Sequence, residues 1–385
     1  MMFISLFLAA LLGITTGQGT VVEIEQSRLP LRNNSQEKIL RSSLGTLKHV
    51  QTLQLVGVGA NSRNFRHLSS LAVTADGSQI LAVNDDGMCS PLSPVASLFI
   101  DVKIKPISGG VFDVLGATTF PMRDPEGNII PFNAQGLAVE GIYQGRGIGN
   151  FFVSSLADGK VYRYSRRMTI QTILGRLRVE LPLMTFRFPN GIQSRQSVDL
   201  GLTDVFGDCR YDEGPEAILR PEDKSEFSLL MFCRVAMSLA PTSAPRREVF
   251  IGFAYNEFKN VARRFYVEST RRPWAGILQI TDMAELSNGD IMFVFSIRFK
   301  EDIMTIGYVR RKDLSRALSQ GETVKPVSIA DISRRERYNI GEEVGLAVRE
   351  DPKSGKTFVY IVNHDFYGEA GVTLLTTFEW TTASR

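Results

Sequence analysis

The stretch LSSLAVTADGSQILAVNDDG, residues 68–87, decides the fold that the sequence predicts. Two short apolar runs, residues 71–73 and 80–83, flank a turn at Asp76-Gly77, and Asp-Gly readily adopts the positive φ angle of a tight hairpin. The second run ends in Asp85-Asp86-Gly87. Two buried strands joined by such a hairpin are typical of the inner half of a β-propeller blade.

A similar unit recurs along the chain, each copy with two apolar strands and a polar turn or loop between them. The first strands of the copies are anchored at Leu71, Leu137, Ala217, Met283 and Leu346. These anchors lie roughly 60 to 80 residues apart, farther than the ~40–50 residues of a compact blade. We therefore expect an all-β fold, a single β-propeller over residues 20–385, with six blades and long insertions between strands.

Two further features refine this expectation. A ring of blades closes when a strand from one terminus completes the blade made by the other. Residues 372–378 are strand-like and are the expected neighbour of an N-terminal strand, for which residues 21–24 and 50–56 both qualify. Residues 312–320 predict one short helix capped by Asp313, because Leu314, Ala317 and Leu318 recur at helical spacing.

Composition excludes several classes of function. The net charge of +3 over 385 residues is small and the arginine pairs are scattered, so no nucleic-acid partner is expected. No apolar stretch reaches the ~18 residues of a membrane span. We expect a monomer whose partner is a small-molecule or anionic substrate.

The N-terminal sequence predicts secretion. Residues 3–14 form an apolar run followed by Thr15-Thr16-Gly17, so residues 1–19 are expected to be a cleaved signal peptide. A buried N-terminal strand is the alternative. Asn33-Asn34-Ser35 is an N-glycosylation sequon, which would make the secreted protein a glycoprotein.

The chain has three cysteines: Cys89, Cys209 and Cys233. An odd number excludes a dense disulfide framework. Cys209 and Cys233 flank the third repeat and could pair in an oxidising compartment, or Cys233 could be an ordinary core residue.

Polar side chains recur beside the inner strands, and in a propeller these positions converge at the mouth of the central channel. They are Asp85, Asp86, Gln135, Glu216, Arg234, Arg298, Glu343, His364 and Asp365. Converging carboxylates repel one another unless a cation, a proton or an arginine neutralises them. Each residue also has a structural interpretation: the acids as caps of strand ends and turns, the arginines as partners in channel salt bridges.

The order of several motifs resembles the phytase-like family, the "esterase-like activity of phytase" domain. The resemblance covers most of residues 60–380. It rests on residues 65–87, 135–138, 212–217 (DEGPEA), 291–299, 342–347 and 362–366. The chain differs from the family pattern at Gln135 and Val344, where glutamate is typical, and at His364-Asp365, where Asp and Asn are commoner.

The resemblance implies a secreted hydrolase of ester or phosphoester substrates, with Ca²⁺ as its cofactor. In this scheme the catalytic residues are Glu216, Glu343 and His364. Arg234, Arg298 and Gln135 bind the substrate, and Asp85, Asp86 and Asp365 bind the metal. The alternative is a non-catalytic binding or scaffold propeller whose channel carboxylates and arginines are structural. The sequence has no Gly-x-Ser-x-Gly elbow, P-loop or His-Glu-x-x-His motif.

Overall fold

The computed structural model describes most of the chain. The described residues are 19–33, 35, 38–84, 97–122, 134–155, 159–165, 168–172, 175–179, 198–199, 206, 209, 214–224, 226–239, 247–270, 277–298, 303–339, 341–364 and 372–383.

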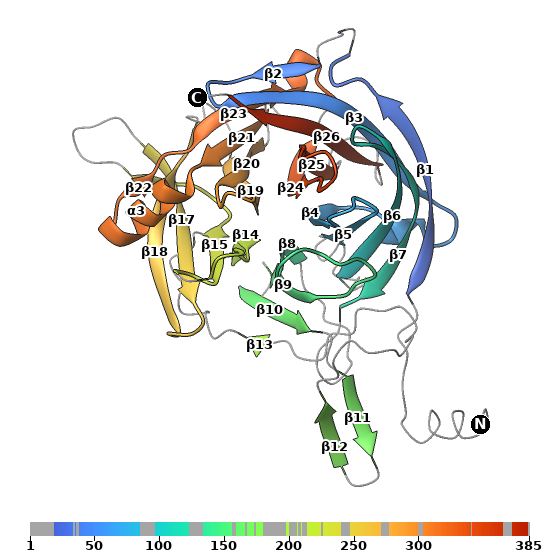
Figure 1. Cartoon of the computed structure of the whole chain (residues 1–385), viewed down its shortest axis with the longest axis horizontal. Helices are drawn as coiled ribbons and strands as arrows, with labels where there is room; N and C mark the ends of the chain where they lie inside the picture. The colour runs from blue at the N-terminus through green and yellow to red at the C-terminus, as the bar shows by residue number, and fades with distance from the viewer. Residues whose placement is uncertain are drawn as a thin grey trace.

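The described strands form a β-propeller of five radial blades (Figure 1). Blade 1 runs from β4 (Leu68–Val73) at the axis through β5 (Gln79–Asn84) and β6 (Leu98–Ser108) to β7 (Val111–Pro121). Blade 2 contains β8 (Ala134–Val139), β9 (Asn150–Ser155), β10 (Lys160–Ser165) and β13 (Val198–Asp199). Blade 3 contains β14 (Pro215–Leu219), β15 (Leu229–Cys233), β17 (Arg247–Asn256) and β18 (Val261–Glu268), with β16 (Met237–Leu239) and β22 (Thr323–Val324) paired to its outer strands.

The last two blades complete the ring. Blade 4 contains β19 (Ile277–Glu285), β20 (Ile291–Arg298), β21 (Ile303–Val309) and β23 (Val327–Ser333). Blade 5 contains β24 (Glu342–Glu350), β25 (Thr357–His364), β26 (Val372–Thr382) and β3 (Gly45–Val58). A separate hairpin, β11 (Met168–Thr172) and β12 (Gly175–Val179), pairs only with itself among the described strands.

The predicted single propeller is confirmed, but the expected six blades are not what the described strands form. The five innermost strands, β4, β8, β14, β19 and β24, each contact the next, and β24 contacts β4. This closed ring leaves no place for a sixth innermost strand. The longest interval between repeats, from β8 to β14, contains the β11–β12 hairpin rather than another blade.

The predicted closure is also confirmed. β26 pairs with β3 from Val372 opposite Val56 to Thr382 opposite Gly45, so the N-terminal region supplies the outermost strand of blade 5. β1 (Thr20–Leu29) then pairs with both β3 and β7 and thereby joins blade 5 to blade 1. β2 (Ile39–Arg41) covers the other half of β3. Antiparallel pairing of the two termini satisfies the edges that an open ring would expose.

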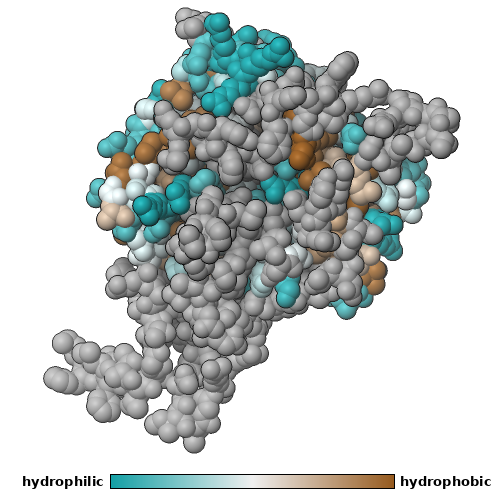
Figure 2. All heavy atoms as spheres, turned by 180° about the vertical axis from the view of Figure 1, so that it is seen from behind, coloured by the Kyte–Doolittle hydropathy of each residue, from teal (hydrophilic) through white to brown (hydrophobic). Residues whose placement is uncertain are grey.

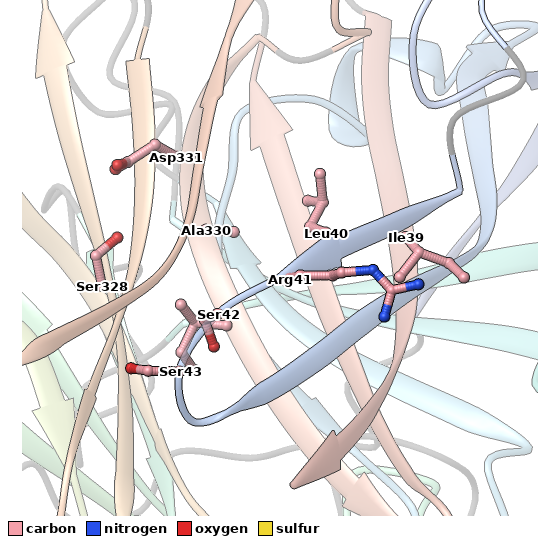
Figure 3. Close-up of a pocket in the computed structure, with 9 residues that line it drawn as sticks. Ile39, Leu40, Arg41, Ser42, Ser43, Ser328, Ala330 and Asp331 are labelled. Carbon is pink, nitrogen blue, oxygen red and sulfur yellow. The ribbon is translucent and has the colours of Figure 1, made fainter. Parts of the chain in front are cut away.

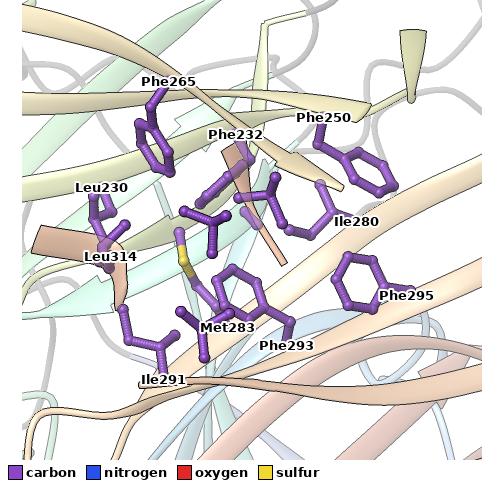
Figure 4. Close-up of a cluster of buried hydrophobic side chains, with 14 of the residues drawn as sticks. Leu230, Phe232, Phe250, Phe265, Ile280, Met283, Ile291, Phe293, Phe295 and Leu314 are labelled. Atoms are coloured by element: carbon purple, nitrogen blue, oxygen red, sulfur yellow. The ribbon is translucent and has the colours of Figure 1, made fainter. Parts of the chain in front are cut away.

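Each seam between neighbouring blades is filled by its own cluster of buried apolar side chains. The cluster between blades 3 and 4 is rich in phenylalanine (Figure 4). There the rings of Phe232 and Phe293 meet edge to face, with centroids 5.6 Å apart. This geometry is favourable for aromatic pairs. Blade-to-blade packing therefore provides the apolar core, as it must when each sheet buries both faces.

The predicted helix is present as α3 (Arg311–Gln320), which buries Leu314, Ala317 and Leu318 against blade 3. Its predicted cap is wrong. Asp313 lies in the first turn, and the Oδ1 atom of Asp290 instead accepts a hydrogen bond from the Arg311 N–H at 2.8 Å. The cap comes from the turn before β20, which sequence spacing within the helix could not reveal.

The hairpin that decided the fold has the expected geometry. Gly77 adopts a φ of 67°, and Asp76 Oδ1 accepts hydrogen bonds from Thr74 and from Ser78. From behind, hydrophilic side chains gather at the top of the view, with smaller apolar areas along the sides (Figure 2).

Candidate functional site

Every innermost strand has a bulge or irregularity, which lies near the beginning of β4, β8, β14 and β24 and near the middle of β19. The breaks in pairing fall between Leu68 and Ser70, Ala134 and Leu137, Pro215 and Ala217, Ile280 and Asp282, and Glu343 and Gly345. Aligned on these breaks, the strands read LSSLAV, AQGLAV, PEAILR, ITDMAE and EVGLAV, from residues 68, 134, 215, 280 and 343. Bulges re-aim side chains and are frequent beside functional sites. We name the face at which the innermost strands begin the upper face, and the opposite one the lower face.

The bulge of β14 holds a buried ion pair at the upper face. Glu216 is 1% exposed, and its Oε2 atom lies 3.0 Å from Nε of Arg234. Arg234 follows β15 directly, and its carbonyl accepts the Ile280 N–H of blade 4 at 3.1 Å. The arginine is the more exposed member, with 13% of its side chain accessible. Its backbone is therefore fixed to the neighbouring blade while its side chain holds Glu216.

Gln135 occupies the position of Glu216 in blade 2, and it is likewise buried. Gly136, the next residue, packs against β14 so closely that an added Cβ would lie 2.3 Å from the carbonyl oxygen of Glu216. Ser154 connects the two strands by donating to that carbonyl at 2.9 Å and accepting the Gly136 N–H at 2.8 Å. Only glycine allows this approach, which sets the position of Glu216 relative to blade 2.

Asp282 lies beside the bulge of β19 and is fully buried. Its Oδ2 accepts hydrogen bonds from the Ser70 hydroxyl of β4 and the Leu346 N–H of β24, each at 2.8 Å. Its Oδ1 accepts the Met283 N–H at 2.9 Å. Burial raises the pKa of Asp282 well above its usual value, despite these donors, and the Glu216 carboxylate raises it further. One carboxyl group thus joins blades 4, 5 and 1 close to the axis.

Strand register places three other predicted residues at the upper face, as backbone positions. Arg298 ends β20 opposite Ile277, the first residue of β19. Glu343, the second residue of β24, is opposite Asn363, and His364 is opposite Glu342, the first residue of β24. These three positions therefore lie at the same face of the ring as Gln135, Glu216 and Arg234. Asp85, Asp86 and Asp365 lie outside the described residues.

Cys209 and Cys233 form a disulfide, which resolves the alternative left open by the sequence. Cys233 is the last residue of β15 and lies opposite Pro215 at the start of β14. The bond therefore anchors residue 209 beside the strand ends that carry Glu216 and Arg234.

Among the described residues no group of three or more His, Cys, Asp and Glu side chains is arranged to hold a metal ion. Glu216 is paired with Arg234, and both oxygens of Asp282 accept protein hydrogen bonds, so these acids do not fit as calcium ligands. The acids predicted to bind metal fall outside the described residues.

A groove of about 570 Å³ lies away from this face, between β2 and β23 at the rim (Figure 3). Arg41, Ser42 and Ser43 line one side, and Ser328 and Asp331 line the other. None of the predicted site residues that the structure describes lines it.

Asp282 and Ser70 are residues of the upper face for which the sequence predicted no role, and both lie within innermost strands. An ungapped alignment of the five innermost strands could have identified Asp282 from the sequence. It places Ser70, Gly136, Ala217, Asp282 and Gly345 at one position, where a single carboxylate stands among small residues.

No family model matches the sequence, and no curated protein matches it. The solved structures that match this chain include two at low similarity. The tail fiber of Staphylococcus aureus phage P68 has a TM-score of 0.40 and 10% identity over 92% of this chain, and the chain spans 55% of the tail-fiber chain. The β-propeller domain of Vanderwaltozyma polyspora Nup133 has a TM-score of 0.27 and 11% identity, covering 94% of this chain and 99% of that domain.

The described part of the chain contains no helix with the length and apolar character needed to cross a membrane.

Proposed function

We propose that this chain is a hydrolase of ester or phosphoester bonds, acting on a small anionic substrate at the upper face of the propeller. The observation that carries the proposal is the ion pair between Glu216 and Arg234. The charge of Glu216 also contributes to the raised pKa of the buried Asp282. Buried ionisable groups with strongly perturbed pKa values cluster at functional sites.

The residues divide naturally between acid–base and binding roles. A guanidinium stabilises an adjacent carboxylate in its ionised form, which is the form a general base needs to accept a proton from water. Glu216 is the proposed base. Arg234, the more exposed partner, is suited to hold the anionic group of the substrate.

The roles proposed for the remaining predicted residues rest on where their strands place them. Gln135 and Arg298 would bind substrate, and Glu343 and His364 would assist proton transfer, since strand register brings these positions to the same face. Any calcium ion would be held by Asp85, Asp86 and Asp365, because the described carboxylates are engaged with protein donors.

A secreted, glycosylated monomer is part of the same proposal. Disulfides persist in oxidising compartments, so the Cys209–Cys233 bond supports secretion. Asn33 of the sequon is exposed, and its Oδ1 accepts a hydrogen bond from Asn339 at 3.0 Å, which leaves Nδ2 as the atom for a glycan.

A non-catalytic scaffold is the second candidate, and the hydrogen bonds of Asp282 favour it. Both oxygens of this carboxyl group accept donors from three innermost strands, as a structural lock would.

The test is hydrolysis of p-nitrophenyl phosphate and p-nitrophenyl acetate by the full chain, with calcium or with a chelator. The proposal expects turnover of at least one substrate and a loss of about 100-fold in kcat/KM for Glu216→Gln. The substitution should fold normally, because glutamine already occupies the equivalent buried position in β8. Absence of turnover under both conditions would leave the scaffold as the function.

A further inference from the structure

A second pocket lies between blades 4 and 5, near the upper face but away from the Glu216–Arg234 pair. It has a volume of about 400 Å³, within the range of small-molecule sites. The segment that joins β23 to β24 forms one wall, and β25, β26, β3 and β1 supply the remainder. Its polar lining consists of Asn33, Gln54, Arg334, Arg337, Asn339 and Asn363, with the hydroxyl-bearing ring of Tyr338.

The charge of this lining is one-sided. Arg334 and Arg337 both line the pocket, and the described lining residues include no Asp or Glu. Glu336, between the two arginines in sequence, is not part of the lining. Two guanidinium groups on one wall of a pocket favour oxyanions such as phosphate and carboxylate.

Asn363 supplies the observation that points to a ligand. Its side chain is 1% exposed, and its Oδ1 accepts the Leu374 N–H at 2.5 Å, which assigns the amide orientation. Its Nδ2 is buried and makes no hydrogen bond. Gly341 lies directly beside this nitrogen, since an added Cβ would be 1.9 Å from it. A buried donor without an acceptor costs free energy, and an oxyanion in the pocket would satisfy it.

The wall that carries the arginines is held in place before any ligand binds. Arg32 donates from Nε to the Glu336 carbonyl at 2.8 Å and lies over the Tyr338 ring, 5.2 Å from its centroid. Asn339 donates to the Pro30 carbonyl at 2.7 Å, and the Asn33 N–H donates to the Arg337 carbonyl at 2.9 Å. A preorganised wall reduces the entropy lost on binding.

We propose that this pocket binds the phosphate or carboxylate group of a small molecule, with Asn363 Nδ2, Arg334 and Arg337 as its donors. The site is separate from the proposed hydrolytic site and does not depend on that activity.

The experiment is isothermal titration calorimetry of the full chain with inorganic phosphate and, in a parallel arm, with acetate at constant ionic strength. Saturable binding that the pocket variants weaken is expected, and the two arms show which oxyanion the pocket prefers. Asn363→Asp keeps the acceptor for Leu374 but replaces the donor with a carboxylate oxygen, so affinity should fall about tenfold or more. Arg337→Gln, at an exposed position, should have a similar effect without affecting folding.

A matched variant makes the result decisive. Arg335→Gln removes the same charge from the same turn but lies outside the lining, so it should leave affinity within about twofold. Absence of saturable binding in both arms, or equal losses in Arg335→Gln and Arg337→Gln, would each overturn the assignment.

Discussion

At the lower face, charged side chains and backbone groups close each of the five seams between blades. The upper face instead contains two buried carboxyl groups, Glu216 and Asp282, of which Glu216 is paired with an arginine and Asp282 accepts hydroxyl and amide hydrogen bonds. Both faces are built on the same innermost strands and differ only in which end of each strand they use. The lower face therefore shows which contacts close the ring, and the contacts of the upper face can be compared with them.

The lower face shows what closure of the ring requires. Arg220, with 1% of its side chain exposed, binds Glu140 of blade 2 at 3.1 Å and Glu257 of its own blade at 2.7 Å, and it lies over the Phe152 ring. The other four seams are joined by backbone and side-chain hydrogen bonds. They link Gln79 with Arg146, Glu222 with Glu285, Ser287 with Glu350, and Arg349 with Ala75.

The upper face departs from this pattern. Glu216 has Arg234, but Asp282 is buried with only hydroxyl and amide donors, and the like charge of Glu216 acts on it. Burial of a carboxylate without a cation is unfavourable. The lower face shows that this fold closes its seams without such burial, so the difference supports a functional site at the upper face.

The largest expected effect is on Asp282. Asp282→Ala should lower the free energy of unfolding by about 3–5 kcal/mol, because the Leu346 N–H, Met283 N–H and Ser70 hydroxyl lose their acceptor. Urea unfolding measures it. Ser70→Ala, which removes one donor only, should lose about 1 kcal/mol. Equal stability of Asp282→Ala and the unaltered protein would show that the Asp282 hydrogen bonds do not hold the three strands together.

The disulfide is expected to have the next largest effect. Replacing both Cys209 and Cys233 by alanine frees a loop with a sequence separation of 24 residues. Loop-closure entropy then predicts a loss of about 3 kcal/mol. Denaturant unfolding of the double variant gives the value, and unfolding of the unaltered protein in reductant provides the comparison. A change below about 1 kcal/mol in both would contradict the anchoring role.

Arg220→Ala should cost about 2 kcal/mol, because Glu140 and Glu257 would remain together, partly exposed, without their shared cation. The effect should be confined to stability. Thermal unfolding and kcat/KM, measured on the same preparation, show whether a substitution at the lower face changes stability alone. A variant that stays stable but loses activity would reverse the roles given to them.

The smallest expected effect is a loss of stability at low pH. Burial opposes ionisation of Glu140, but hydrogen bonds from Lys224, Asn150 and Arg220 outweigh it and lower its pKa to about 2. The folded pKa lies below the usual 4.5, so the stability from this group is present above pH 4.5 and lost as pH falls toward 2. With screening at this partly exposed site, about 1 kcal/mol is expected. The unfolding midpoint of Glu140→Gln should therefore approach that of the unaltered protein as the pH falls through this range, and parallel curves would contradict the assignment.

The sequence predicts the propeller and its closure well because both depend on local patterns. The Asp76-Gly77 hairpin and the strand-like residues 372–378 can be recognised from the residue types alone, without tertiary information. The number of blades is less accessible, since a long interval can hold an extra blade or, as after β10, a hairpin outside the ring. The anchor of the third repeat was also placed one residue early, because the bulge at Glu216 makes Ile218 the equivalent of Leu71.

The site is predicted less completely than the fold. Strand ends identified Gln135, Glu216 and Arg234, and the geometry brings Glu216 and Arg234 into contact. The interactions of Asp282 with Ser70 and Leu346 join residues of three different blades. Only the closed ring brings these residues together, so no spacing within a single repeat could reveal their interaction.

The most direct test of the account compares Glu216→Gln with Glu140→Gln, since each neutralises an acid bound to an arginine, one at each face. The measurement is kcat/KM for p-nitrophenyl phosphate and p-nitrophenyl acetate, alongside the unfolding midpoint. We expect Glu216→Gln to lose about 100-fold in kcat/KM while remaining folded, and Glu140→Gln to keep its activity with a lower midpoint. Full activity in Glu216→Gln, or an equal loss in both variants, would contradict the division of function and stability between the two faces.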